Sequence, residues 1–158
     1  MLVSLLPVCL TALALCAAPA EPSPADDALV AEFRVYYDKD KTPEERREAI
    51  LTLEGSDSAA AIEALSVALD DDEYLVRRAA VDVMASMRDP AGAQWLVEEV
   101  LEDRKRSKNE VLVAGVIEVL GGMRHALARE AIEEYLGDRD LGLRLGAVNG
   151  LARLGDPA

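Results

Sequence analysis

Apolar side chains recur every three or four residues along most of the chain, which is the spacing of one face of an α-helix. The first such segment, residues 27–38, follows a candidate cap at Asp26 or Asp27 and carries a stripe made of Leu29, Val30, Phe33, Tyr36 and Tyr37. No stretch alternates apolar and polar residues as a half-buried β-strand does. The pattern therefore predicts an all-α protein.

Capping residues divide the rest of the chain into short helices. Thr42 and Glu45 form a candidate capping box around Pro43, which suits the first helical position, and Gly55 is expected to end that helix. "DDDEYLVRRAAVDVMASM" predicts a later helix with an apolar stripe of Leu75, Ala79, Val83 and Met84. Further boundaries are predicted at Asp89-Pro90, at a Ser107–Glu110 capping box and at the glycine pair Gly121-Gly122.

These helices form pairs that repeat along the chain. Residues 143–158 align without a gap with residues 76–91, and both segments close on Asp-Pro-Ala. The equivalent apolar positions Ile50, Val81, Val116 and Val148 are separated by 31, 35 and 32 residues. A period of this length is typical of stacked helix pairs. Residues 28–158 are therefore predicted to form an α-solenoid of antiparallel helix pairs, with about three and a half repeats and an N-terminal capping helix.

The first twenty residues, "MLVSLLPVCLTALALCAAPA", have no charged side chain and end in an Ala-x-Ala pattern. They predict a signal peptide over residues 1–20, a linker over 21–27 and export to the periplasm or the exterior. An uncleaved membrane anchor is the main alternative. Lipid attachment at Cys16 is another, although Leu15 does not match the residue that a bacterial lipobox has before its cysteine. Cys9 and Cys16 are both removed by cleavage, which leaves no disulfide in the mature fold.

Charge narrows the choice of partners. The chain has 30 acidic and 17 basic residues and a net charge of −13. Such a surface repels phosphate backbones, which argues against nucleic-acid binding. Hydrophobic residues make up 51% of the chain and aromatic residues 4%, a composition typical of packed helices.

The sequence offers no catalytic or metal-binding constellation. His125, expected near a helix start, is the single histidine, so neither a zinc site nor a histidine-based nucleophile is supported. The acidic run at residues 70–73 lacks the ligand spacing of an EF-hand and is expected to cap the following helix. No phosphate loop, dinucleotide motif or nucleophile elbow is present. We therefore expect no enzyme activity, cofactor or metal.

The recurring pattern Arg–x–x–Ala–Val–x–x–Leu–x–x–Leu–x–Asp–Pro–Ala, followed by a shorter helix, resembles HEAT repeats over residues 42–158. The resemblance is to the short bacterial kind that also occurs in phycobilin lyases. It implies that Arg46, Arg77 and Arg144 form a ladder with acidic groups of the preceding turns, which Leu112 interrupts in the third repeat. It also implies that the second helix of each pair lines the concave surface.

Acidic side chains recur on those second helices. Glu63, Glu98 and Glu133 occupy equivalent positions, and Glu99 and Glu134 lie beside two of them. Stacking would align them in an acidic ridge that binds a basic segment of a protein partner, with Trp95 as a possible anchor. The alternative is an ordinary solvated helix face.

The function predicted from these features is an exported, non-enzymatic interaction module or scaffold. The alternative is a lyase-type enzyme or enzyme subunit resembling phycobilin lyases, which the export signal disfavours. A third hypothesis is that the protein is a purely structural component of the cell envelope.

The fourth repeat raises a separate expectation, because only its first helix is present in the sequence. That helix carries Leu143, Val148, Leu151 and Leu154, and we expect one of its sides to stay open. A fragment of a longer solenoid or self-association through residues 141–154 would account for the open side.

Export is directly testable. We expect the protein purified from its native source to begin at Glu21, because cleavage after Ala20 fits the Ala-x-Ala pattern. N-terminal sequencing measures this, and mass spectrometry detects lipid. A native chain that begins at Met1 contradicts cleavage, and lipid on Cys16 replaces it with the lipoprotein alternative.

Overall fold

The computed structural model describes residues 24–103 and 105–155, and within those residues it contains helices and turns but no β-strand. The helices in chain order are α1 (Pro24–Tyr36), α2 (Pro43–Leu51), α3 (Ala59–Leu65), α4 (Tyr74–Ser86), α5 (Pro90–Leu96), α6 (Glu110–Met123), α7 (Ala128–Glu133) and α8 (Leu141–Leu154). Short 3₁₀ or π turns extend or join them: η1 (Ser66–Asp70), η2 (Val97–Leu101), η3 (Arg106–Lys108) and η4 (Glu134–Gly137). None of the helices in the described part is long and apolar enough to span a bilayer.

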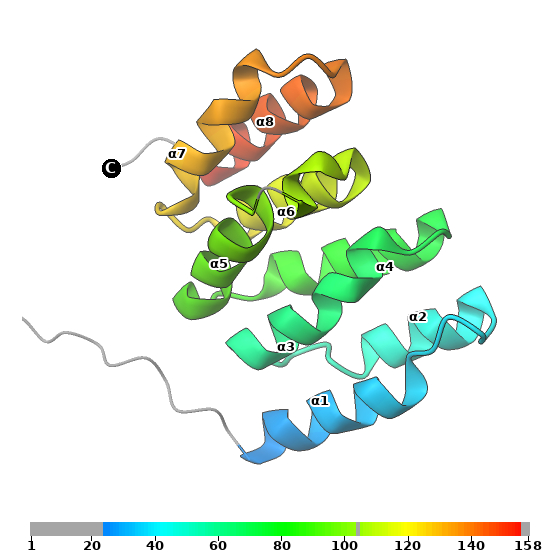
Figure 1. Cartoon of the computed structure of the whole chain (residues 1–158). Coiled ribbons are helices and arrows are strands. Elements are labelled where there is room, and N and C mark those ends of the chain that lie inside the picture. Colours follow the sequence, from blue (N-terminus) through cyan, green and yellow to red (C-terminus); the bar gives the residue numbers. More distant parts are fainter. Residues whose placement is uncertain (1–23, 104, 156–158) are drawn as a thin grey trace, which may run out of the picture.

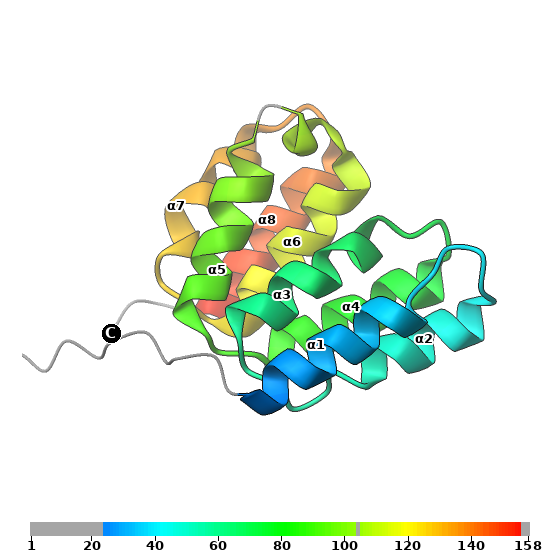
Figure 2. The same ribbon diagram turned by 60° about the horizontal axis from the view of Figure 1, so that its bottom comes forward.

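The helices stack in two layers, with α1 at one end and α8 at the other (Figure 1). Helices α2, α4, α6 and α8 form the layer of first helices, and each packs on the next. Helices α1, α3, α5 and α7 lie in the other layer (Figure 2). This arrangement is an α-solenoid of antiparallel helix pairs, as the sequence predicts.

The buried core follows the repeated apolar positions in the first three repeats. Ile50 and Val116 are 0% exposed and Val81 is 5% exposed. The fourth equivalent position, Val148, is 53% exposed while Leu143 and Ala147 face the core, which agrees with the expectation that one side of this helix stays open. No described element packs on the side of α8 where Val148 lies.

Leu75 also departs from its prediction. It is 61% exposed, whereas its expected companions Ala79, Val83 and Met84 are buried. Leu75 lies in the first turn of α4 beside Val76, which is 0% exposed and is the residue that this turn directs into the core.

Helix α1 covers the first repeat. Val30 and Phe33 are buried, and the Phe33 ring stacks on Tyr37 with 5.1 Å between centroids. The helix begins at Pro24, inside the segment expected to be a linker. Asp26 lies within its first turn and accepts a hydrogen bond from the Ser56 hydroxyl at 2.6 Å, so it joins α1 to the turn before α3 rather than capping α1.

Local side-chain chemistry explains most helix starts. The Thr42–Glu45 capping box is present, and Asp89 caps α5 with Pro90 as its first residue. The predicted Ser107–Glu110 box is wrong. Asn109 caps α6 instead, and its side-chain oxygen accepts from the Leu112 amide at 3.2 Å.

The glycine pair does not end its helix, contrary to the prediction. Helix α6 continues to Met123 and ends at Arg124, which has a left-handed backbone with φ 56°. A Cβ on Gly121 would lie 2.8 Å from the Cα of Gly150 in α8, and one on Gly122 would lie 2.5 Å from the Cβ of Ala85 in α4. The two glycines therefore allow the backbones of three successive first helices to approach closely.

The close packing of α6 on α8 at Gly121 predicts that alanine is destabilising there but not at Gly146, a glycine of α8 outside this contact. Gly121→Ala should lower the free energy of unfolding by about 1–3 kcal/mol, because the new methyl group pushes α6 from the α8 backbone. Gly146→Ala should be neutral or stabilising by up to about 1 kcal/mol, because a Cβ there meets nothing within 4 Å and alanine favours the helix. Chemical denaturation followed by circular dichroism measures both. A Gly121→Ala protein as stable as the wild type would contradict the close packing of α6 on α8.

Candidate functional site

The five glutamates of the predicted acidic ridge are all exposed on the layer of second helices. Glu63 lies on α3, the pair Glu98 and Glu99 lies in η2, and Glu133 and Glu134 lie where α7 continues into η4. Glu98 accepts a hydrogen bond from the Gln94 amide at 2.7 Å, and Glu133 lies 3.8 Å from the guanidinium of Arg129. Their exposure fits the prediction, and their role in binding stays a prediction.

The structure places one of these glutamates in a groove. A hollow of about 240 Å³ lies between η2 and α7, and its apolar lining consists of Val97, Leu101, Leu127 and Ala131. The carboxylates that line it belong to Glu102, Glu130 and Glu134, and no cation is among the lining residues. We call this hollow the acidic groove.

Of the three groove carboxylates, the repeat pattern predicts Glu134 as a binding residue but not Glu102 or Glu130. Glu130 stands four residues before Glu134, so helical spacing could have placed both on one face. Glu102 directly follows η2, and its position beside α7 depends on how one repeat packs on the next. Glu63, Glu98, Glu99 and Glu133 do not line the groove.

Trp95, the proposed anchor, is half-buried and packs against the core. The Arg106 guanidinium lies over its ring, 5.8 Å from the centroid. This cation covers one face of the indole, and Trp95 does not line the acidic groove. A partner that stacks on that face would have to displace Arg106.

A second hollow, of about 580 Å³, lies near the turns at the start of α6. Its charged lining residues have both signs: Lys39, Lys105, Arg106, Asp70 and Asp103. Asp70 accepts from Asn109, and Asp103 accepts from the backbone amides of Lys105 and Arg106. Because these opposite charges offset one another locally, this hollow discriminates less by charge than the acidic groove does.

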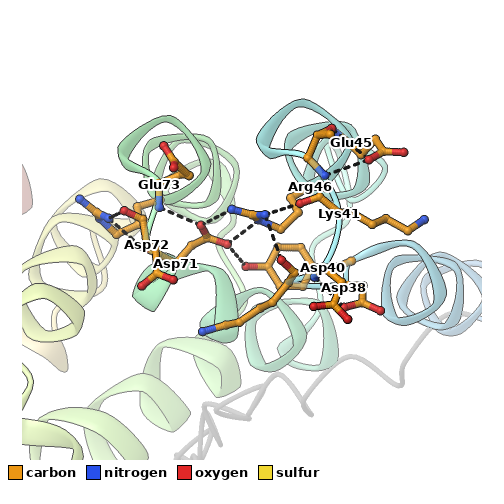
Figure 3. A network of polar contacts seen from close by, with 12 residues as sticks. Asp38, Asp40, Lys41, Glu45, Arg46, Asp71, Asp72 and Glu73 are labelled. Atoms are coloured by element: carbon orange, nitrogen blue, oxygen red, sulfur yellow. Dashed lines mark hydrogen bonds and ion pairs between the residues drawn. The ribbon is translucent and has the colours of Figure 1, made fainter.

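A buried ion pair joins the first two repeats. Arg46 donates from Nε and Nη2 to the two carboxylate oxygens of Asp71, each at 2.9 Å, and the two side chains are 8% and 1% exposed (Figure 3). The Tyr37 hydroxyl donates to Asp71 at 2.7 Å, and the Glu73 amide donates to it at 2.9 Å. The carboxylate is thus fully hydrogen-bonded, as a buried charge must be.

These contacts shift the pKa values of the network. Burial acts to raise the pKa of Asp71, but the hydrogen bonds from Arg46, the Glu73 amide and Tyr37 together hold it below its ordinary value. The bond to Asp71 raises the pKa of Arg46. Burial, followed by the bond to Asp71, raises the pKa of Tyr37. Asp71 is therefore a carboxylate at neutral pH.

The expected arginine ladder has different partners from those predicted. Arg77 donates to the carbonyl oxygens of Asp71 and Asp72. Arg144 donates likewise to the carbonyl oxygens of Asp138 and Arg139. The guanidinium of each of these arginines therefore stabilises the preceding turn by bonding the backbone carbonyls of that turn, not its acidic side chains.

Arg46 bonds the carbonyl of Lys41 in the same way, and its carboxylate partner Asp71 comes from the following repeat. Leu112, at the interrupted position of the third repeat, is 9% exposed and belongs to the core.

The acidic run at residues 70–73 was expected to cap α4, but no side chain of the run does so. The N-cap residue Glu73 makes no side-chain capping bond, and the Asp71 carboxylate bonds Arg46 instead.

His125 lies in the turn before α7, and its backbone carbonyl accepts a hydrogen bond from the Ala128 amide. Within residues 24–103 and 105–155, no group of three or more His, Cys, Asp or Glu side chains is placed to hold a metal ion.

The stacked helix pairs define an α-solenoid repeat protein. The family model for HEAT repeats matches residues 30–112, which is just over half of the chain, and the chain therefore belongs to the HEAT repeat family. It is also similar to a deoxyhypusine hydroxylase of Drosophila pseudoobscura pseudoobscura, with 31% identity over 104 residues. The match covers 66% of this chain and 33% of the relative, so the chain spans about a third of that protein's length.

The ion pair predicts a pH-dependent contribution to stability. Asp71→Asn should lower the free energy of unfolding at neutral pH by about 3–5 kcal/mol, because Arg46 is left buried without an opposite charge. The pKa of Asp71 is lower in the folded state, so its contribution is present above the unfolded pKa of about 4 and is lost as the pH falls through the folded value. The difference between wild type and variant should therefore shrink below about pH 4.

Denaturation across this pH range measures the difference. The matched control is Asp82→Asn, because Asp82 pairs with Arg78 at the surface, where the side chains are 58% and 39% exposed. It should change the free energy of unfolding by less than about 1 kcal/mol. Equal effects of the two substitutions at neutral pH would show that burial of the Asp71 pair contributes nothing.

Proposed function

We propose that this HEAT repeat protein is a non-enzymatic interaction module or scaffold, and that it binds a basic segment of a protein partner in the acidic groove. The observation that supports this is the groove itself, in which Glu102, Glu130 and Glu134 surround an apolar floor without a lining cation. The step from a repeat fold to protein binding is an analogy with other repeat proteins.

The groove suits lysine or arginine better than a purely apolar side chain. The aliphatic stem of either residue can lie along Val97, Leu101 and Leu127 while its charged end meets the carboxylates. The net charge of −13 also attracts cations from a distance and speeds encounter.

A hollow of about 240 Å³ holds only a side chain or two, so a partner must contact more of the surface. The exposed glutamates of the second helices, Glu63, Glu98, Glu99 and Glu133, extend the same charge beyond the groove. We propose that a longer basic segment crosses them. No nucleic acid is expected among the partners, because the acidic surface repels phosphates.

We also propose that the protein acts in the periplasm or outside the cell. This proposal rests on residues 1–20, which lie outside the described part of the chain. Membrane attachment would require that this segment stays uncleaved or that Cys16 carries lipid.

Hydroxylation is the second candidate function, and the 31% identity to the Drosophila deoxyhypusine hydroxylase favours it. The matched region is a third of that relative, so its activity does not carry over to this chain by similarity alone. The non-enzymatic proposal fails if the purified chain adds oxygen to deoxyhypusine in a substrate protein, as read by mass spectrometry. The phycobilin-lyase alternative stays a prediction from the sequence.

Neutralising the acidic groove should weaken binding of a basic segment. The variant replaces Glu102, Glu130 and Glu134 together with glutamine. A peptide of alternating lysine and leucine is a suitable probe, and its dissociation constant should rise about tenfold, since three partly exposed charge pairs together contribute about 1.4 kcal/mol. Isothermal titration calorimetry at low and physiological salt measures the change, and the wild-type affinity should fall with salt.

The matched control removes the same charge elsewhere, by glutamine at the exposed residues Glu32, Glu44 and Glu48 of α1 and α2. It should retain most of the wild-type affinity, because the net charge falls equally while the groove is intact. Equal weakening by both triple variants would show that the peptide responds to overall charge, and the proposed groove would then be only a solvated surface.

A further inference from the structure

The hollow of about 580 Å³ near the start of α6 has a different set of lining residues from the acidic groove. Its lining comes from the turn before α2, from η1, from η2 and η3, and from the first turn of α6, so it spans successive repeats. Sites for small organic ligands commonly have volumes of about 300–1,000 Å³. The hollow is therefore large enough to enclose much of a small ligand.

Three side chains give the hollow an apolar lining. Val100 and Leu112 are 1% and 9% exposed and belong to the core, whereas Val67 is 52% exposed. A hydrocarbon that covers Val67 and touches the two buried side chains removes apolar surface from water, which is favourable. The lining therefore suits a ligand with an aliphatic body.

The uncharged polar side chains of the lining are already bonded within the protein. The Ser66 hydroxyl donates to the Glu63 carbonyl at 2.7 Å. The Asn109 side chain donates to Asp70 at 2.8 Å and accepts from the Leu112 amide at 3.2 Å. Polar recognition of a ligand therefore falls mainly to the charged side chains.

The charged side chains of the lining leave one positive charge in excess, because three are cations and two are carboxylates. Both carboxylates already accept hydrogen bonds, Asp70 from a side-chain amide and Asp103 from the backbone amides of Lys105 and Arg106. The ammonium groups of Lys39 and Lys105 form no ion pair with any described residue. The bonding capacity left for a ligand is thus mainly that of cations, in a chain whose net charge is −13.

We propose that this hollow binds a small organic monocarboxylate with an aliphatic chain. The carboxylate meets the ammonium groups of Lys39 and Lys105, and the chain lies along Val67, Val100 and Leu112. The flexible stems of the two lysines allow their ammonium groups to follow the carboxylate. The site is independent of the basic segment proposed for the acidic groove, so either proposal stands if the other fails.

The net charge of the lining selects a single negative charge on the ligand. One carboxylate cancels the excess positive charge. A polyphosphate would place further negative charge beside Asp70 and Asp103, and the net charge of −13 would repel it more strongly. A cationic ligand would add to the local excess instead of cancelling it.

Titration of the isotope-labelled full chain with octanoate at neutral pH, followed by NMR of the backbone amides, tests the proposal. The amide signals of Val67, Asn109 and Leu112 should shift and saturate, with a dissociation constant on the order of 1 mM for a ligand of this size. Those of Leu127 and Ala131 in the acidic groove should not shift. Hexanoate, which is shorter by two CH₂ groups, should bind about tenfold more weakly, since each buried CH₂ tightens binding about three- to fourfold.

The four lysines of the chain provide a matched pair of variants. Lys39→Gln combined with Lys105→Gln should weaken octanoate binding about fivefold, because two partly exposed charge pairs are lost. Lys41→Gln combined with Lys108→Gln changes the net charge equally at lysines outside the lining, and it should retain the wild-type affinity. Since Lys39 and Lys105 are exposed, their variant should keep the wild-type circular dichroism and melting temperature.

Equal weakening by the two double variants would overturn the proposal, because octanoate would then respond only to overall charge. The absence of shifts at Val67, Asn109 and Leu112 at about 10 mM octanoate would also overturn it. Octylammonium has the same chain and the opposite charge, and equal affinity for these amides would contradict selection of an anion. Hexanoate that binds as tightly as octanoate would show that the apolar lining does not hold the chain.

Discussion

Each helix pair in this protein has an apolar face that only the next pair can cover, and the rest of the structure depends on that constraint. The layer α2, α4, α6 and α8 satisfies it by close packing, which Gly121 and Gly122 bring to near backbone contact. At one end α1 covers the first repeat with Val30 and Phe33. At the other end Leu141, Leu145 and Val148 of α8 are exposed, so the two ends of the described stack have different surfaces.

A second kind of contact fixes the turns between helices. In all four repeats an aspartate accepts the amide two residues ahead, and these aspartates are Asp38, Asp71, Asp103 and Asp138. Arginines then hold the turn carbonyls in three of the repeats. Only the Arg46–Asp71 pair among these groups is a buried ion pair, so it is the position where loss of one charge costs most.

The acidic groove is a consequence of the same stacking. The second helices are short and end in 3₁₀ or π turns, and neighbouring pairs leave a hollow between η2 and α7. Leu127 and Ala131 from one repeat and Val97 and Leu101 from the preceding one form its floor. Carboxylates at helix ends then surround it. A partner bound there would contact two repeats at once.

The sequence by itself determined the helical class, the repeat and most of the caps, because apolar spacing and capping are local properties. It placed Ile50, Val81 and Val116 in the core for the same reason. Tertiary structure decided what depends on neighbours. Val148 is exposed because no described helix covers it, Gly121 and Gly122 continue a helix because an adjacent backbone needs their space, and Asn109 replaces Ser107 as the cap. Glu102 and Glu130 join Glu134 only when one repeat packs on the next, so a single helix pattern could not reveal the groove.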